Sequence, residues 1–188
     1  MKPEVTSDSI RRELQRVNRA RGEDFQRTFT QYAIERLLYR LSCSDAVDRF
    51  VLKGAMVFAL WTGQLHRSTR DLDLAGHGDP GPELLGTLFR QLCVLDIEAD
   101  GVQFDAESVT VSEIREQEQY LGQRIRLIAH LEQSWVKVQV DVGFGDAITP
   151  APTWAFYPTF LPMAAPRCAS IPKKLSLRRS YRRWWRSD

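Results

Sequence analysis

Asp71 and Asp73, two aspartates separated by one leucine, are the side chains in this sequence that most clearly suggest chemistry. In the run 71–74, acids alternate with leucines, which is typical of a short strand with one buried face. Residues two apart on a strand point to the same side, so the two carboxylates would lie side by side. Adjacent carboxylates repel each other unless a cation lies between them, and hard oxygen ligands suit Mg²⁺. The pair therefore indicates a magnesium site, although an isolated Asp-X-Asp is also common on solvated strand faces.

A third carboxylate on a neighbouring strand would complete a two-metal site for in-line displacement at phosphorus. Asp141 is the natural candidate, because it lies near the end of the apolar run 136–142 and just before a glycine-rich turn. It either interrupts the apolar face of that strand or flanks it. Asp146, which follows Gly145, is a less suitable candidate because it could cap the turn. The predicted catalytic and metal-binding residues are Asp71, Asp73 and Asp141.

Small and basic residues near the aspartates could hold the phosphates of a nucleotide. Gly54 ends a short apolar strand, and a backbone without a side chain at a strand-to-helix turn can approach phosphates closely. Lys53, Arg67 and Arg70 are candidate phosphate clamps, because ammonium and guanidinium groups pair with phosphate oxygens. The predicted nucleotide-binding residues in this part of the chain are Lys53, Gly54, Ala55, Arg67, Ser68, Thr69 and Arg70.

In the elements that must position these residues, apolar residues recur with two different spacings, one typical of helices and one typical of strands. Apolar residues recur at helical spacing in 23–42, and 9–20 is predicted to form a more polar helix. Two alternating runs, 124–131 and 135–142, are joined by the polar link 132–134, which is typical of a β-hairpin. Helices first and a mixed sheet afterwards predict an α+β domain. The other expected elements are strands at 50–52, 71–74 and, in part, 102–114, and helices at 55–61 and 83–94.

The composition is that of a globular protein without a membrane partner. The chain has 188 residues, of which 43% are hydrophobic and 27% are charged, and this balance excludes disorder of the whole chain. No apolar run reaches the roughly 18 residues of a membrane span, and residues 1–8 lack the apolar block of a signal peptide. The cysteines form no CxxC pair, which predicts small buried thiols in a reducing cytoplasm. These cysteines are Cys43, Cys93 and Cys168.

Several segments together resemble the AbiEii/AbiGii-type nucleotidyltransferase toxins of bacterial type IV toxin–antitoxin systems. They are FVLKGAMVFALWTG, HRSTRDLDL, VQVDVGFGD and YPTFLPMAAPR, and the resemblance runs from about Phe25 to Pro172. It implies a DNA-polymerase-β-like nucleotidyltransferase core that uses Mg²⁺ and an NTP donor. By the same resemblance, Asp71 and Asp73 are the metal pair and Asp141 is the third carboxylate.

The resemblance also implies further site residues and partners. A basic phosphate-binding residue is expected at Arg124 or Arg126, and Arg126 is included in the predicted nucleotide-binding set. The acceptor is expected to be an RNA such as tRNA, or a protein, and the partner a cognate antitoxin. Gly54 is followed by Ala55 where many similar proteins have glycine or serine, so this turn lacks a hydroxyl.

The end of the chain differs from the rest. Residues 172–188 carry seven basic residues and one acid, so the remainder has a net charge of −4. Their Arg, Trp and Ser content is typical of GC-rich coding DNA read in a wrong frame, and back-translation from Lys173 in a shifted frame gives the Ala-Glu-Lys helix that similar proteins have there. We therefore expect a truncated or frameshifted chain with three parts. These are a helical, partly flexible segment (1–22), a nucleotidyltransferase domain (23–171) and a disordered basic tail (172–188).

Three functions remain open at this point. An active Mg²⁺-dependent nucleotidyltransferase would move NMP from an NTP to a hydroxyl of RNA or protein. A pseudo-enzyme would keep the fold without turnover, because its C-terminal part is missing. An RNA-binding protein would act through the basic tail, whose arginines can pair with phosphates while its aromatic residues stack on bases.

Overall fold

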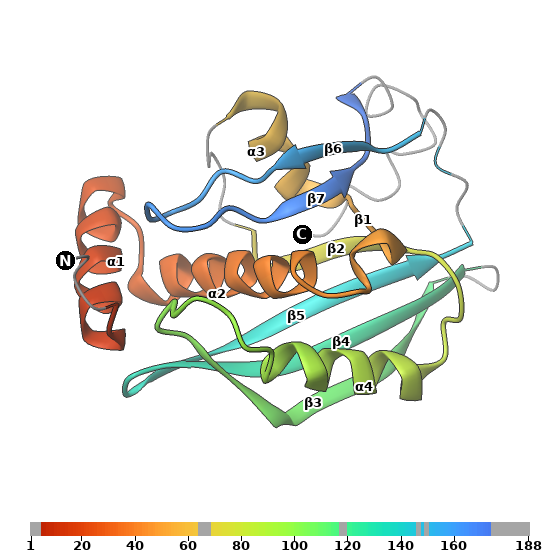
Figure 1. Cartoon of the computed structure of the whole chain (residues 1–188), viewed down its shortest axis with the longest axis horizontal. Coiled ribbons are helices and arrows are strands. Elements are labelled where there is room, and N and C mark those ends of the chain that lie inside the picture. The colour runs from red at the N-terminus through yellow and green to blue at the C-terminus, as the bar shows by residue number, and fades with distance from the viewer. Residues whose placement is uncertain (1–4, 64–68, 117–119, 146–147, 149–150, 174–188) are drawn as a thin grey trace.

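A seven-stranded mixed sheet forms the centre of the structure, with helices packed on it (Figure 1). This computed structural model describes residues 5–63, 69–116, 120–145, 148 and 151–173. The predicted α+β architecture, with N-terminal helices before a mixed sheet, is confirmed. The elements in chain order are α1 (Ser7–Arg21), α2 (Phe25–Ser42), η1 (Val47–Arg49), β1 (Phe50–Leu52), η2 (Gly54–Met56), α3 (Val57–Thr62), β2 (Asp71–Gly76), α4 (Pro82–Cys93), β3 (Gln103–Glu116), β4 (Tyr120–Leu131), β5 (Ser134–Phe144), β6 (Thr153–Phe156) and β7 (Arg167–Ser170).

The central strand of the sheet is β2. The strand order is β3-β4-β5-β2-β1-β7-β6. β2 pairs in parallel with β5 and antiparallel with β1, and β7 joins the far side of β1 in parallel. The β3–β4, β4–β5 and β6–β7 pairs are antiparallel. Since β1 and β2 come early in the chain and β5 and β7 come late, residues distant in sequence become neighbours at the centre.

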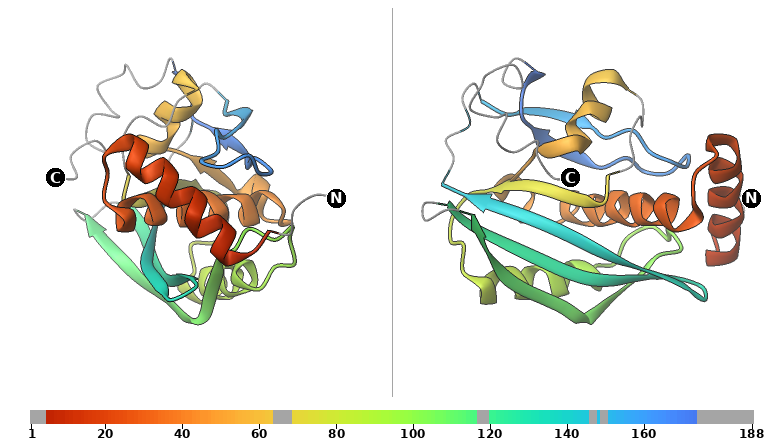
Figure 2. Two further views of the ribbon diagram at one scale, coloured as in Figure 1. Left: turned by 90° about the vertical axis from the view of Figure 1, so that its left-hand side faces the viewer. Right: turned by 180° about the vertical axis from the view of Figure 1, so that it is seen from behind.

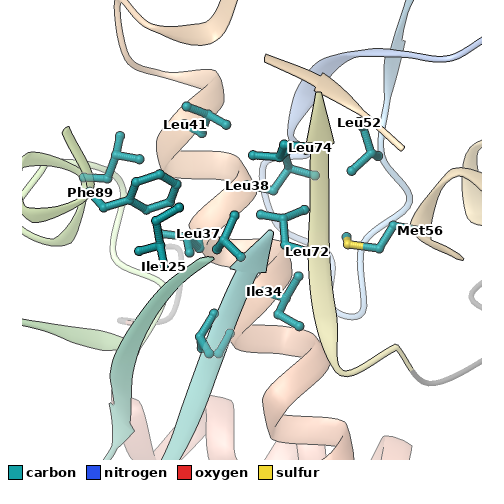
Figure 3. Close-up of a cluster of buried hydrophobic side chains, with 14 of the residues drawn as sticks. Ile34, Leu37, Leu38, Leu41, Leu52, Met56, Leu72, Leu74, Phe89 and Ile125 are labelled. Carbon is teal, nitrogen blue, oxygen red and sulfur yellow. The ribbon is translucent and has the colours of Figure 1, made fainter. Parts of the chain in front are cut away.

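One face of the sheet is covered by α2 and α4, which pack on β5 and β3 respectively (Figure 1). The close-up in Figure 3 shows Leu72 and Leu74 of β2 pointing toward Leu37 and Leu38 of α2. Both β2 leucines are only 1% exposed, and the valines of β5 are buried as well. Because side chains alternate along a strand, the acidic residues of β2 lie on the other face. Figure 2 shows that face in its right-hand view, with α3 beside it and α2 behind the sheet.

A cluster of buried charges holds α2 against the loops around it. Asp100, in the loop before β3, accepts hydrogen bonds from Arg36 Nε at 3.0 Å and Arg40 Nη1 at 2.6 Å. Glu35 accepts a hydrogen bond from the backbone N–H of Phe160 at 2.8 Å, and burial raises the pKa of its carboxyl to about 7. Removing one member would leave a buried charge without its partner. The cluster therefore anchors the loop before β3 and the segment between β6 and β7.

The structure differs from the sequence-based expectations in several places. β5 continues through Gly143 to Phe144, where a break was expected, and β4 begins at Tyr120 rather than near 124. The expected helix 55–61 is a 3₁₀ turn followed by the short α3. β6 and β7 were not predicted, because their proline-rich surroundings give no alternating pattern and β7 depends on a distant partner, β1.

Two other expectations concern exposure and the tail. The prediction of buried thiols is correct for Cys93 and Cys168 and wrong for Cys43, which is exposed at the end of α2. Of the expected disordered tail, 172–188, the structure describes Pro172 and Lys173, and residues 174–188 lie outside the described residues. Within the described ranges, the helices are all too short or too polar to cross a membrane.

Adjacent leucines of α4 provide a test of the packing. Leu85 is fully buried, whereas Leu84 is 52% exposed. Leu85→Ala should lower the free energy of unfolding by about 2 to 5 kcal/mol, because a cavity remains beneath the helix. Leu84→Ala, the matched control on the same helix, should change it by roughly 0.5 kcal/mol or less. Urea denaturation measures both, and equal losses would contradict the placement of α4.

Candidate active site

The parallel pairing of β2 with β5 brings the three predicted carboxylates onto one face. Asp73 lies directly opposite Asp141, and Asp71 lies opposite Gln139. Neighbouring strands are about 4.8 Å apart, so the opposed carboxylates are near neighbours. Val140 and Val142, on either side of Asp141, are fully buried on the helix-covered face. Asp141 therefore flanks the apolar face of its strand, and all three acids lie on the opposite, polar face.

Arg124 of β4 extends this row of charges by one strand. It lies opposite Asp141, and its Nε and Nη2 donate to the two carboxylate oxygens at 2.8 and 2.7 Å. Arg126, two residues further along, lies opposite Gln139 and donates to its side-chain oxygen at 3.3 Å. Of the two arginines left open by the sequence, Arg124 is the one that contacts a carboxylate.

Lys53 and Gly54 approach Asp73 from the β1 side. The backbone N–H of Lys53 donates to the carbonyl of Asp73 at 2.9 Å, and Lys53 is buried. Gly54 has a φ of +67°, and a side-chain carbon at this position would overlap the Oδ2 of Asp73. The glycine is therefore required by two constraints, the left-handed backbone and the close approach of the carboxylate. Gly54 opens the 3₁₀ turn η2.

The carboxylates of β2 have perturbed acidities. Burial raises the pKa of Asp73 to about 6; the charge of Lys53 opposes this rise, while Asp141 and Asp71 add to it. Burial and the charge of Asp141 also raise the pKa of Asp71, against the opposing effect of Arg124. The raised values mean that the fold disfavours the ionised forms of both β2 acids. Such a site has excess negative charge that a cation would relieve.

The donor set fits a hard divalent cation, because three carboxylates share one face and two of them have raised pKa values. Within the part of the chain that is described, no three acidic, histidine or cysteine side chains converge closely enough to hold an ion as they stand. The position of Asp141 provides a reason, since both of its oxygens accept hydrogen bonds from Arg124. Metal binding would therefore require rearrangement of this pair.

The remaining residues of the predicted nucleotide-binding set have fewer described contacts with the three carboxylates. Thr69 Oγ1 donates to the carbonyl of Asp71 at 2.9 Å, which supports the start of β2. Arg70 is exposed and lies next to Asp71, whose pKa its charge lowers. Ala55 is half-buried in η2. The two other predicted residues of this stretch, Arg67 and Ser68, lie outside the described residues, as does Asp146.

Gln139 is a site residue that the sequence reasoning missed. Its side-chain N–H donates to Asp141 Oδ2 at 3.5 Å, and its oxygen accepts from Arg126. Gln139 thus links the second arginine to the third carboxylate. The available signal was its place two residues before Asp141, which puts both side chains on the same face of β5.

Alanine substitutions at two glycines distinguish the cost of a clash with Asp73 at Gly54 from the cost of a left-handed backbone alone. Gly63 also has a positive φ, +70°, but nothing lies within 4 Å of the position of an added side-chain carbon. Gly63→Ala should cost about 1 kcal/mol from strain alone. Gly54→Ala should cost on the order of 2 to 4 kcal/mol, because the Asp73 carboxylate must also shift. Thermal and urea unfolding measure both variants, and equal costs would show that Asp73 does not lie against Gly54.

The raised pKa of Asp73 predicts a pH-dependent stability. Its folded value of about 6 exceeds the roughly 3.9 of an unfolded chain, so the stability from this group is complete below about pH 4 and is lost as the pH rises through 6. Asp73→Asn, a neutral isostere, should therefore stabilise the metal-free protein by on the order of 2 to 3 kcal/mol at pH 8 and by about half as much at pH 5.

Urea denaturation with a chelator present measures this effect. Asp45→Asn, at an exposed position, controls for the loss of one carboxylate. An Asp73→Asn effect that is the same at both pH values would contradict the raised pKa.

Comparisons with known proteins identify the family of the chain. The crystal structure of JHP933 from Helicobacter pylori has 14% identity and a TM-score of 0.48, over 80% of this chain and 53% of that one. A candidate nucleotidyltransferase from H. pylori has 17% identity and a TM-score of 0.45, over 78% and 54%. The chain thus spans about half the length of these proteins, and no curated protein matches it significantly. Residues 36–173 match the family described as nucleotidyl transferase AbiEii toxin, Type IV TA system, and the chain belongs to this family, as its motifs predicted.

Proposed function

We propose that this site transfers a nucleoside monophosphate from an NTP to a hydroxyl group, with Mg²⁺ as the cofactor. The observation that carries the proposal is the row formed by Asp73, Asp141 and Arg124 on three neighbouring strands. Asp71 lies on the same face, and Lys53 approaches from the other side of β2. Membership of a nucleotidyltransferase family supports the reaction class.

The three carboxylates would hold the metal, and the basic residues around them would hold the phosphates. Asp71, Asp73 and Asp141 are hard oxygen donors on one face. When bound, Mg²⁺ would neutralise the triphosphate and lower the pKa of the attacking hydroxyl. Lys53 follows β1 and Arg124 lies on β4, on opposite sides of the acids, and the charges of both lower the pKa of Asp73, which supports them as phosphate ligands. The predicted phosphate contacts of Ala55, Thr69, Arg70 and Arg126, and of Arg67 and Ser68, belong to the same proposal.

The transfer itself is an in-line displacement. The acceptor oxygen forms a bond to the α-phosphorus of the NTP while the bond from that phosphorus to the α–β bridging oxygen breaks. Pyrophosphate leaves with the bridging electron pair, and the hydroxyl proton is lost to water. The contribution of this chain is to fix the triphosphate on a rigid sheet, since α2 packs on β5 and on the buried leucines of β2.

The acceptor and the partner complete the proposal. The family description places these proteins in toxin–antitoxin systems, which supports a cognate antitoxin as the partner of this chain. We propose an RNA such as tRNA as the acceptor, with a protein hydroxyl as the alternative that the transfer assay also tests.

Isosteric replacement of the carboxylates tests the proposal. With labelled NTP, Mg²⁺ and total tRNA, Asp73→Asn and Asp141→Asn should each lower transfer by more than about 100-fold, because loss of a direct metal ligand exceeds the effect of losing an outer partner. Asp45→Asn, at an exposed position of the chain, should transfer like the parent. A parallel reaction with a protein extract in place of tRNA identifies a protein acceptor. Full transfer by Asp73→Asn would refute the metal role.

A further inference from the structure

The three carboxylates of the site are not equivalent. Asp141 receives a two-point contact from Arg124, at 2.8 and 2.7 Å, and a third donor, Gln139, lies 3.5 Å from its Oδ2. The side chains of Arg124 and Asp141 are 32% and 20% exposed, so the pair is partly withdrawn from water. Asp71 and Asp73, by contrast, lie on the strand to the other side of β5, away from β4. The predicted third metal ligand, Asp141, therefore already has a guanidinium bonded to both of its oxygens.

This pairing competes with a metal. A bidentate guanidinium uses both oxygens of its carboxylate, and its charge repels a divalent cation that approaches the same group. Partial burial strengthens the pair relative to a surface salt bridge. Mg²⁺ that reaches the β2 acids without a nucleotide would therefore have to displace Arg124 before it gained Asp141.

A triphosphate offers Arg124 an alternative partner of the same chemistry. Guanidinium groups bind phosphate oxygens in the same two-point manner as carboxylates. Arg124 extends from β4 over the polar face where the nucleotide is proposed to bind, and its partial exposure leaves a path for it to turn. Exchange from carboxylate to phosphate would conserve the two hydrogen bonds of Arg124 and release the oxygens of Asp141.

We propose that Arg124 is an exchange residue, which pairs with Asp141 in the nucleotide-free protein and moves to the phosphates of a bound NTP, so that Mg²⁺ gains Asp141 only with the nucleotide. The proposal rests on the proposed function and adds an order of assembly to it. Metal and nucleotide then promote each other's binding, because each favours the state in which Arg124 has left Asp141. In the nucleotide-free protein, the same pair keeps the cation site incomplete.

Arg126 provides a matched control for charge. It lies on the same strand and face, and the charges of both arginines lower the pKa of Asp71, so either replacement removes a positive charge that the acids sense. Of these two arginines, Arg124 donates to Asp141, whereas Arg126 donates to Gln139. A difference between Arg124→Gln and Arg126→Gln therefore isolates the contact with Asp141 from the general electrostatic effect.

The test measures Mn²⁺ binding without nucleotide, by the paramagnetic signal of the free ion, at pH 8. Arg124→Gln should bind Mn²⁺ about 10-fold more tightly than the parent, and clearly more tightly than Arg126→Gln. Adding Asp141→Asn to Arg124→Gln should abolish that gain, and the loss should be at least about fivefold larger than the loss from Asp141→Asn in the parent. Arg124→Lys, which keeps the charge without the two-point contact, should be intermediate and guards against a folding defect.

Two results would overturn the inference in distinguishable ways. If Arg124→Gln and Arg126→Gln bind Mn²⁺ equally, Arg124 does not block Asp141, while the proposed function stands. If the parent and all variants fail to bind Mn²⁺ both with and without a non-hydrolysable NTP analogue, the proposed metal site fails, and the exchange fails with it.

Discussion

The parallel pairing of β2 with β5 is the constraint on which the rest of the site depends. The faces of both strands are fixed from behind, because Leu72 and Leu74 of β2 and the valines of β5 are all buried on the side of the sheet that α2 covers. A shift of one residue in either strand would turn every side chain of that strand to the other face. The apolar side of the sheet therefore determines that Asp73 and Asp141 share the polar face, where the strand pairing sets them opposite each other. The same two strands thus carry the apolar core on one face and the acidic residues on the other.

Ionisation of the site's carboxylates costs free energy, which the rest of the fold must offset. Asp73 is pressed against Gly54 on one side and lies next to another carboxylate on the other. The raised pKa of Asp73 reports that cost. The charges of Lys53 and Arg124, one on each side of the acids, lower the pKa of Asp73, but it remains above its ordinary value. Repulsion between neighbouring carboxylates and raised pKa values of this kind are typical of functional sites.

The chain has a second charged cluster, and the contrast between the two is instructive. Asp100 is 2% exposed, and Arg36 and Arg40 hold its carboxylate beneath α2. Glu35 nearby has a pKa of about 7, a rise as marked as that of Asp73, yet it is buried and bonded to a backbone N–H. Perturbed acidity alone therefore does not identify a candidate active site. What distinguishes the β2–β5 cluster is its partly exposed position on the face that α2 and α4 leave open (Figure 2).

The sequence by itself determined the local elements and the faces of their side chains. Helical spacing gave α2, and strict alternation placed Asp71 and Asp73 together, because both periods are properties of a few consecutive residues. Only the tertiary structure decided which strand lies beside β2, and hence that Asp141 is the neighbour of Asp73. It also added β6 and β7, and it distinguished Arg124 from Arg126. That last distinction follows from the β4–β5 register, in which Leu131 pairs with Ser134, whereas the sequence suggested a longer link. Pairing between strands depends on distant side chains that pack together in three dimensions, and no local period records it.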